Sequence, residues 1–183
     1  MTNGMASTRA AEHFGTVLVA MVTPFDKDMK LDIDAGVKLA KKLVDDGCDG
    51  LVLAGTTGES PTTSTEEKLT LMREVKAAVG DRAKIVAGAG NYSTASSIEL
   101  ARKSEAAGAD ALLVVTPYYS KPPQEGLYQH FKAVAEAVDS PVMLYDIPGR
   151  TATPIAEETA MRLAEVPNIV AIKEAKGDLA AGG

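Results

Sequence analysis

The feature that most constrains the fold is a regular alternation of short apolar runs with longer amphipathic segments, repeating about every thirty residues. Each apolar run is rich in β-branched residues and is closed by a turn, which is typical of a strand buried between helices. The runs predict strands at residues 16–22, 50–54, 84–87, 111–115, 141–145 and 169–173. The intervening segments predict helices from Asp32 or Asp34 to Asp46, and at residues 64–79, 93–107, 124–138 and 154–165. Strands alternating with helices indicate an α/β fold with parallel strands.

Such a chain forms either an open doubly wound sheet or a closed TIM (β/α)8 barrel. Polar residues of the types used in catalysis follow several successive strands rather than gathering at one crevice, and this distribution favours the barrel. A barrel needs eight β/α units and typically ~250 residues, whereas the 183 residues supply about six. We therefore expect a C-terminally truncated, partial (β/α)8 barrel catalytic domain at residues 14–183, with open strand edges, after a flexible leader at residues 1–13.

Composition excludes several classes of function. Hydrophobic residues make up 45% and charged residues 24%, as in an ordinary globular protein. The net charge of -6 argues against a nucleic-acid partner. Cys48 is the only cysteine and His13 and His130 are the only histidines, so neither an internal disulfide nor a metal site is expected. No signal peptide or membrane span is evident, which predicts a cytoplasmic protein.

Lys173 is the first candidate for chemistry because it ends an otherwise apolar run, Ile-Val-Ala-Ile-Lys. If both faces of this strand are covered, the amine lies at the rim of a desolvated interior, where the neutral form is favoured. A neutral lysine amine can form a Schiff base with a carbonyl substrate. The alternative is a surface lysine whose stem lies along the strand and whose amine reaches water.

The loops after the other strands supply compatible groups. Gly-Thr-Thr-Gly-Glu-Ser at 55–60 offers hydroxyls and free backbone amides, which suit a small carboxylate, although the segment could equally be a simple turn. The glycines at 88 and 90 only weakly suggest a dinucleotide loop, because a third glycine in register and an acidic residue after the next strand are missing. Two tyrosines follow the fourth strand in a proline-stiffened loop. Tyr145 ends the fifth strand, and Arg150 could either bind a carboxylate or form a surface ion pair.

Four motifs together resemble a known family. They are Gly-Thr-Thr-Gly-Glu-Ser at 55–60, Thr-Pro-Tyr-Tyr at 116–119, Leu-Tyr-Asp-Ile-Pro-Gly-Arg-Thr at 144–151 and Ile-Lys-Glu-Ala at 172–175. In this order and spacing they resemble the dihydrodipicolinate synthase family of the pyruvate-dependent class I aldolases. The resemblance runs from about Thr16 to Asp178.

The resemblance implies a lyase of lysine and diaminopimelate biosynthesis that needs no cofactor. Lys173 would form the Schiff base with pyruvate, and Tyr145 would transfer protons. Thr56 would connect Tyr145 to Tyr119, which the neighbouring subunit contributes, so catalysis would require a dimer. The family resemblance further implies a homotetramer built as a dimer of dimers.

The resemblance also assigns the substrates. Thr57 would hold the pyruvate carboxylate, and Arg150 would bind the carboxylate of L-aspartate 4-semialdehyde. Thr65, Lys68 and Ser96 stand where lysine-inhibited members carry a histidine and a glutamate, so weak or absent inhibition by lysine is expected. Two alternatives stay open: a related pyruvate lyase acting on N-acetylneuraminate or a 2-keto-3-deoxy sugar acid, and a non-catalytic chain.

Overall fold

The computed structural model describes residues 10–177, which fall into two compact units. The first unit comprises the chain up to Gly88 together with residues 103–111, and the second comprises residues 89–102 and the chain from Leu112 onward. None of the helices within residues 10–177 combines the length and the apolar character that a membrane span needs.

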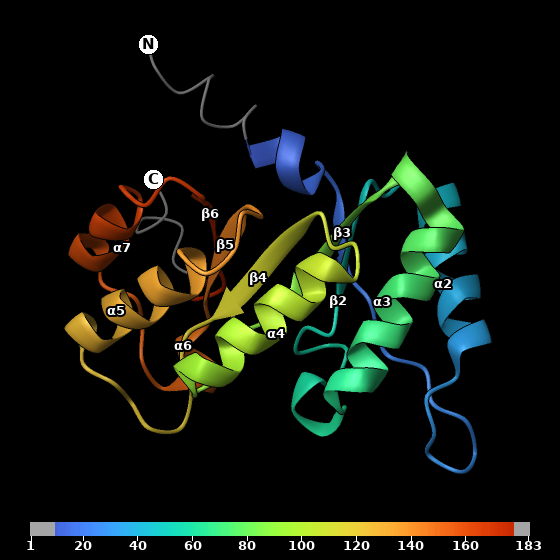
Figure 1. The fold of residues 1–183 in the computed structure, drawn as a ribbon, viewed down its shortest axis with the longest axis horizontal. Coiled ribbons are helices and arrows are strands. Elements are labelled where there is room, and N and C mark those ends of the chain that lie inside the picture. Colours follow the sequence, from blue (N-terminus) through green and yellow to red (C-terminus); the bar gives the residue numbers. More distant parts are fainter. Residues whose placement is uncertain (1–9, 178–183) are drawn as a thin grey trace. The chain divides into compact units, whose positions relative to one another are not determined.

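The first unit is built from three parallel strands and two long helices (Figure 1). Its strands pair in chain order, with Leu18 opposite Gly50 and Val52 opposite Val86. The helices pack against each other and cover an interior that contains the fully buried Leu51, Ile85 and Val75. The elements are β1 (Leu18–Ala20), α2 (Ile33–Asp45), β2 (Gly50–Leu53), the 3-10 helix η1 (Ser60–Thr62), α3 (Thr65–Val79), the 3-10 helix η2 (Gly80–Arg82) and β3 (Lys84–Gly88).

Polar side chains fix the ends of these elements. Asp32 caps α2 by accepting a hydrogen bond from the amide of Ala35 at 2.9 Å. Ser64 and Glu67 form the predicted capping box at the start of α3. Asp49 joins β1 to β2, because its carboxylate accepts hydrogen bonds from the amides of Val17 and Thr16 and from the Thr16 hydroxyl, which lower the pKa of Asp49 to about 2.

The second unit contains the other three parallel strands, which also pair in chain order. Two of its helices, α5 (Gln124–Ala135) and α7 (Glu157–Leu163), pack against each other, and Leu127, Phe131 and Leu163 are fully buried in its core. The elements are α4 (Thr94–Ala106) and β4 (Ala111–Val115), both of which extend across the boundary between the units, and then α5 (Gln124–Ala135), β5 (Val142–Asp146), α6 (Pro148–Thr151), α7 (Glu157–Leu163) and β6 (Ile169–Glu174).

The structure corrects the predicted elements in three places. Residues 10–14 are helical and Phe14 is buried, whereas no helix was predicted there; residues 1–9 of the predicted leader lie outside the described part of the chain. The short helix α6 was not predicted, because its Pro148-Gly149 pair reads as a turn. The last predicted helix, 154–165, shortens to α7, since residues 153–156 are not helical.

Candidate active site

The C-terminal ends of β5 and β6 bring Tyr145 and Lys173 side by side. Val142 pairs with Ile169, but the next residue, Met143, pairs with Ala171, so one residue of β6 bulges out of the ladder. Beyond this bulge the two strands stay in register, and Tyr145 lies directly opposite Lys173. Paired residues of neighbouring strands project from the same face of a sheet, so the two side chains share one face.

The Lys173 amine packs against the Tyr145 ring. Its Nζ atom lies 4.1 Å from the ring centroid, which is a cation–π distance when the amine is charged. Tyr145 is 6% exposed, and Lys173 is partly buried. A lysine amine thus lies beside a tyrosine side chain, and amines and phenols are groups that Schiff-base chemistry can use.

The surroundings of Lys173 differ from the prediction in one respect. We expected β6 to be buried on both faces, but Ile172 is 46% exposed and only Ile169 of this strand is buried. Among the described residues, β6 pairs with β5 alone, which leaves its other edge open. The apolar contact of Lys173 therefore comes from Tyr145 rather than from two covered faces.

The backbone of Tyr145 is fixed by Thr116, which follows β4. The Thr116 amide and hydroxyl both donate to the Tyr145 carbonyl, at 3.0 and 3.2 Å. Thr116 is fully buried, so these hydrogen bonds are shielded from water. The sequence pattern gave no indication of this role, because a threonine after a strand is equally typical of a turn.

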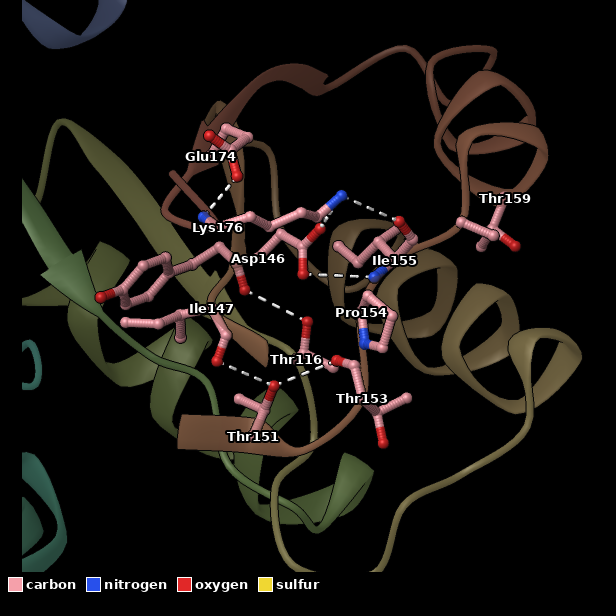
Figure 2. Close-up of polar contacts among 12 residues, drawn as sticks. Thr116, Asp146, Ile147, Thr151, Thr153, Pro154, Ile155, Thr159, Glu174 and Lys176 are labelled. Atoms are coloured by element: carbon pink, nitrogen blue, oxygen red, sulfur yellow. Dashed lines mark hydrogen bonds and ion pairs between the residues drawn. The ribbon is translucent and has the colours of Figure 1, made fainter. Parts of the chain in front are cut away.

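An ion pair with one buried partner lies at the ends of the same two strands and was not predicted. Asp146 is fully buried, and its Oδ2 atom lies 2.9 Å from Nζ of Lys176 (Figure 2). A lysine two residues beyond a strand end is usually solvated, but the side chain of Lys176 is only 26% exposed and contacts Asp146. An acidic residue at the end of an apolar strand was the one signal that could have indicated this pair.

Arg150 and Tyr119 are both exposed in the second unit. Arg150 lies in α6, directly after β5. Tyr119 is 90% exposed and has a positive φ of 71°, and Lys121 has a φ of 47°, so this loop holds an energetically unfavourable backbone conformation. Its neighbour Tyr118 packs edge-to-face on Tyr92 with the ring centroids 5.3 Å apart, and burial raises the pKa of the Tyr118 hydroxyl.

Thr56 and Thr57 belong to the first unit, in the loop after β2. Both are exposed, and within the part of the chain that the structure describes neither hydroxyl makes a hydrogen bond. The loop is held by the Thr23 hydroxyl, which donates to the Gly58 carbonyl at 2.6 Å. That the loop carrying Thr56 and Thr57 approaches Lys173 stays a prediction.

The same loop is closely packed against β3. Ala54, its first residue, has a positive φ of 53°. A Cβ atom at Gly88 would lie 2.1 Å from the Ala54 carbonyl oxygen, so only glycine fits at that position. No group of three or more His, Cys, Asp or Glu side chains that could hold a metal ion occurs among residues 10–177.

A parallel-stranded α/β protein with a lysine amine against a tyrosine ring at neighbouring strand ends fits a lyase of the Schiff-base type. Comparison with known families makes this specific. The model of the Dihydrodipicolinate synthetase family matches residues 13–182, so the chain belongs to this family.

Curated relatives agree with this assignment. The 4-hydroxy-tetrahydrodipicolinate synthase of Corynebacterium jeikeium is 61% identical over 182 residues, which cover 100% of this chain and 61% of the relative. That of Mycobacterium leprae is 61% identical over 168 residues, which cover 92% of this chain and 56% of the relative. The chain thus spans about 60% of the length of the curated relatives it matches.

Solved structures give the same result. A dihydrodipicolinate synthase from Acinetobacter baumannii, solved in complex with pyruvate, is 48% identical with a TM-score of 0.89, over 91% of this chain and 57% of that one. One from Bacillus anthracis is 49% identical with a TM-score of 0.90, over 92% of this chain and 58% of that one. These matches confirm the predicted fold class, α/β with about six units of the TIM-barrel type.

Proposed function

We propose that the protein to which this chain belongs is a 4-hydroxy-tetrahydrodipicolinate synthase, which condenses pyruvate with L-aspartate 4-semialdehyde. The observation that carries the proposal is the contact of the Lys173 amine with the Tyr145 ring, at 4.1 Å. It is supported by identities above 60% to synthases of that name and by the pyruvate complex of the Acinetobacter relative.

Lys173 is the proposed nucleophile. Its neutral amine attacks the ketone carbon of pyruvate, and loss of water leaves an imine. Removal of a proton from the pyruvate methyl group gives an enamine, whose carbon attacks the aldehyde of the second substrate. The substrate amine then displaces the Lys173 nitrogen as the ring closes, which regenerates the enzyme. Tyr145 is the proposed proton carrier in these steps, because it is the phenol beside the amine.

The remaining roles concern binding and proton relay. Thr57 is proposed to hold the pyruvate carboxylate with its hydroxyl and amide, and Arg150 to bind the carboxylate of the second substrate. Thr56 is proposed to link Tyr145 to Tyr119 of a neighbouring subunit. The free hydroxyls of the two threonines support these roles.

A homo-oligomer is part of the proposal. A tyrosine that is 90% exposed on a backbone with positive φ costs conformational energy and gains little packing from the part of the chain that the structure describes. Insertion of Tyr119 into the site of a second copy would offset this cost. The proposed assembly is a dimer of dimers.

The test is to trap the imine. The whole protein is incubated with pyruvate and borohydride, and the mass increase is located by peptide mapping. We expect one adduct per chain, on Lys173, and none in a Lys173→Ala variant, whereas Lys41→Ala, at an exposed lysine of α2, should react as the wild type does. A folded wild-type protein without an adduct would contradict the proposal.

The second substrate is tested separately. We expect turnover with L-aspartate 4-semialdehyde and none with N-acetylneuraminate or 2-keto-3-deoxy sugar acids. The reverse preference would assign the chain to another pyruvate lyase.

A further inference from the structure

Asp146 is a buried carboxylate to which the proposed reaction assigns no role. It is the last residue of β5, directly after Tyr145, and it is fully buried. Because side chains alternate along a strand, Asp146 projects from the face opposite to Tyr145 and does not share the face of the reacting amine. A carboxylate without solvent is costly unless it is paired, so its partners indicate what it does.

The partners of Asp146 come from two separate segments (Figure 2). Its Oδ1 atom accepts a hydrogen bond from the Ile155 amide at 3.2 Å, and its Oδ2 atom lies 2.9 Å from Nζ of Lys176. The Oδ2 contact has the geometry of an ion pair rather than of an aligned hydrogen bond. The Asp146 carbonyl also accepts a hydrogen bond from the Ala175 amide at 2.9 Å, which continues the pairing of β5 with the chain after β6.

Lys176 completes the connection. Its Nζ atom reaches the Ile155 carbonyl at 3.5 Å as well as the Asp146 carboxylate. Its amide donates to the Glu174 carboxylate, which fixes the turn just beyond β6. The lysine therefore holds together the end of β5, the end of β6 and the start of the segment that leads into α7.

The segment between Asp146 and Ile155 is closed into a loop by these contacts. Thr151, which is buried, donates within the loop to the carbonyls of Ile147 and Thr153, at 3.1 and 3.0 Å. The loop carries Arg150. Asp146 is thus connected through the backbone and its ion pair to three proposed site residues, Tyr145, Lys173 and Arg150. It contacts none of their reacting atoms.

We propose that Asp146 and Lys176 form a positioning pair that fixes the ends of β5 and β6 and thereby holds the Lys173 amine against Tyr145. The inference rests on the proposed function and deepens it. Tyr145 precedes Asp146, and Lys173 lies three residues before Lys176, so a shift at either end of the ion pair is passed along the backbone to the amine or to the phenol. Displacement of a reacting group by about 1 Å can slow a reaction by roughly 100-fold.

The test compares Asp146→Asn, Lys176→Met and the double variant in the whole protein. The rate constant for forming the pyruvate adduct, trapped by borohydride, is measured together with the final adduct yield. We expect the rate constant to fall roughly 10- to 100-fold in each variant, with the yield unchanged. Loss of folded protein alone would lower the yield and leave the rate constant of the remaining molecules unchanged.

Two further variants serve as controls. Lys132→Met removes an ion pair with Glu136 on the surface of α5 and should react at the wild-type rate. Lys176→Arg keeps the positive charge and should recover most of the rate. Amide exchange at Ala175 should be faster in Lys176→Met than in Lys132→Met, because the end of β6 is released.

The outcomes are separable. A wild-type protein that forms no adduct overturns the proposed function, and the inference with it. A wild-type protein that reacts, with Asp146→Asn and Lys176→Met reacting at the same rate, overturns the inference alone. Should a single variant fail to fold because it leaves one buried charge unpaired, the double variant decides: a slow adduct supports the pair, and a wild-type rate contradicts it.

Discussion

His130 is a buried histidine of α5 whose environment favours the neutral ring. Its Nδ1 atom shares a hydrogen bond with the Thr94 hydroxyl at 2.9 Å, and its buried Nε2 atom has no hydrogen-bond partner among the described residues. Burial lowers the pKa of the imidazole from 6.5 to about 4. Protonation of His130 at mildly acidic pH therefore favours the unfolded chain.

This predicts a defined pH dependence of stability. Since the pKa is lower in the folded state, the unfolded chain binds the proton more readily, and stability is lost as the pH falls from 6.5 to about 4. The free energy of unfolding should drop by up to ~3 kcal/mol across this range. Urea titrations at pH 7 and pH 5 would measure the change.

A His130→Phe variant is the control, because it cannot be protonated. It should remove most of the dependence between pH 7 and pH 5, since Asp49, with a pKa of about 2, titrates at lower pH. If the free energy of unfolding of the variant still changed with pH as in the wild type, the pH dependence would come from groups other than His130.

Gln124 of α5 supplies a second residue-scale prediction, since it caps α7 in place of the missing N-cap side chain. Its Nε2 donates to the Pro154 carbonyl, and its Oε1 accepts from the Ala156 amide and from the Thr159 hydroxyl, at 2.9 to 3.0 Å. Gln124→Ala should lower stability by about 1–2 kcal/mol, measured by chemical denaturation.

The matched variant for this test is Gln129→Ala. Gln129 lies on the same helix, and among residues 10–177 its side chain bonds only to the exposed Glu125 side chain. Its replacement should cost less than ~0.5 kcal/mol. Equal losses in the two variants would show that Gln124 does not act as the cap of α7.

At the scale of elements, the β-bulge of β6 decides which residue faces Tyr145. An unbroken register from the pair Val142–Ile169 would place Ile172, not Lys173, opposite Tyr145, because Tyr145 lies three positions after Val142. Val170, which lies between the paired Ile169 and Ala171, is the extra residue.

Inserting an alanine between Ala171 and Ile172 should therefore separate the amine from the phenol, because Ile172 would then lie opposite Tyr145. We expect a folded insertion variant to lose the pyruvate adduct on Lys173, as read by borohydride trapping and mass spectrometry. Deletion of Val170 should keep the adduct, because it removes the bulge and leaves Lys173 three positions after Ile169. Val170→Ala keeps the register and should retain the adduct, with a stability loss of about 0.5–2 kcal/mol. A folded insertion variant that reacts at the wild-type rate would contradict the role of the strand register.

The elements themselves were largely predictable from the sequence. The strand at 111–115 and the capped start of α3 were predicted at their observed positions, because apolar runs and capping residues act locally. The surroundings of Lys173 were not predictable, since alternation along β6 is interrupted by the bulge and its burial depends on a neighbouring strand. The pair of Asp146 and Lys176 was missed because it joins residues thirty positions apart that carry no shared pattern.

At the scale of the whole molecule, the proposed sharing of Tyr119 between subunits can be tested by complementation. Lys173→Ala and Tyr119→Ala should each be inactive alone. After unfolding and refolding together, half of the molecules in a random dimer population are mixed, and each has one site with both residues intact. Activity should recover to about one quarter of the wild-type value.

The control is to mix the two refolded variants without unfolding them. Activity should stay absent in that sample for as long as subunits do not exchange. Failure to recover activity after joint refolding would place both residues in one subunit and contradict the proposed assembly.

The close approach of the Ala54 carbonyl to Gly88 limits how this chain can vary. A library of all substitutions at position 88, selected for growth without supplied lysine, should return glycine alone, whereas Gly149, where a Cβ meets nothing within 4 Å, should accept many residues. Evolution can therefore change the loop that carries Thr56 and Thr57 only in ways that keep a glycine, with a hydrogen atom for a side chain, at position 88.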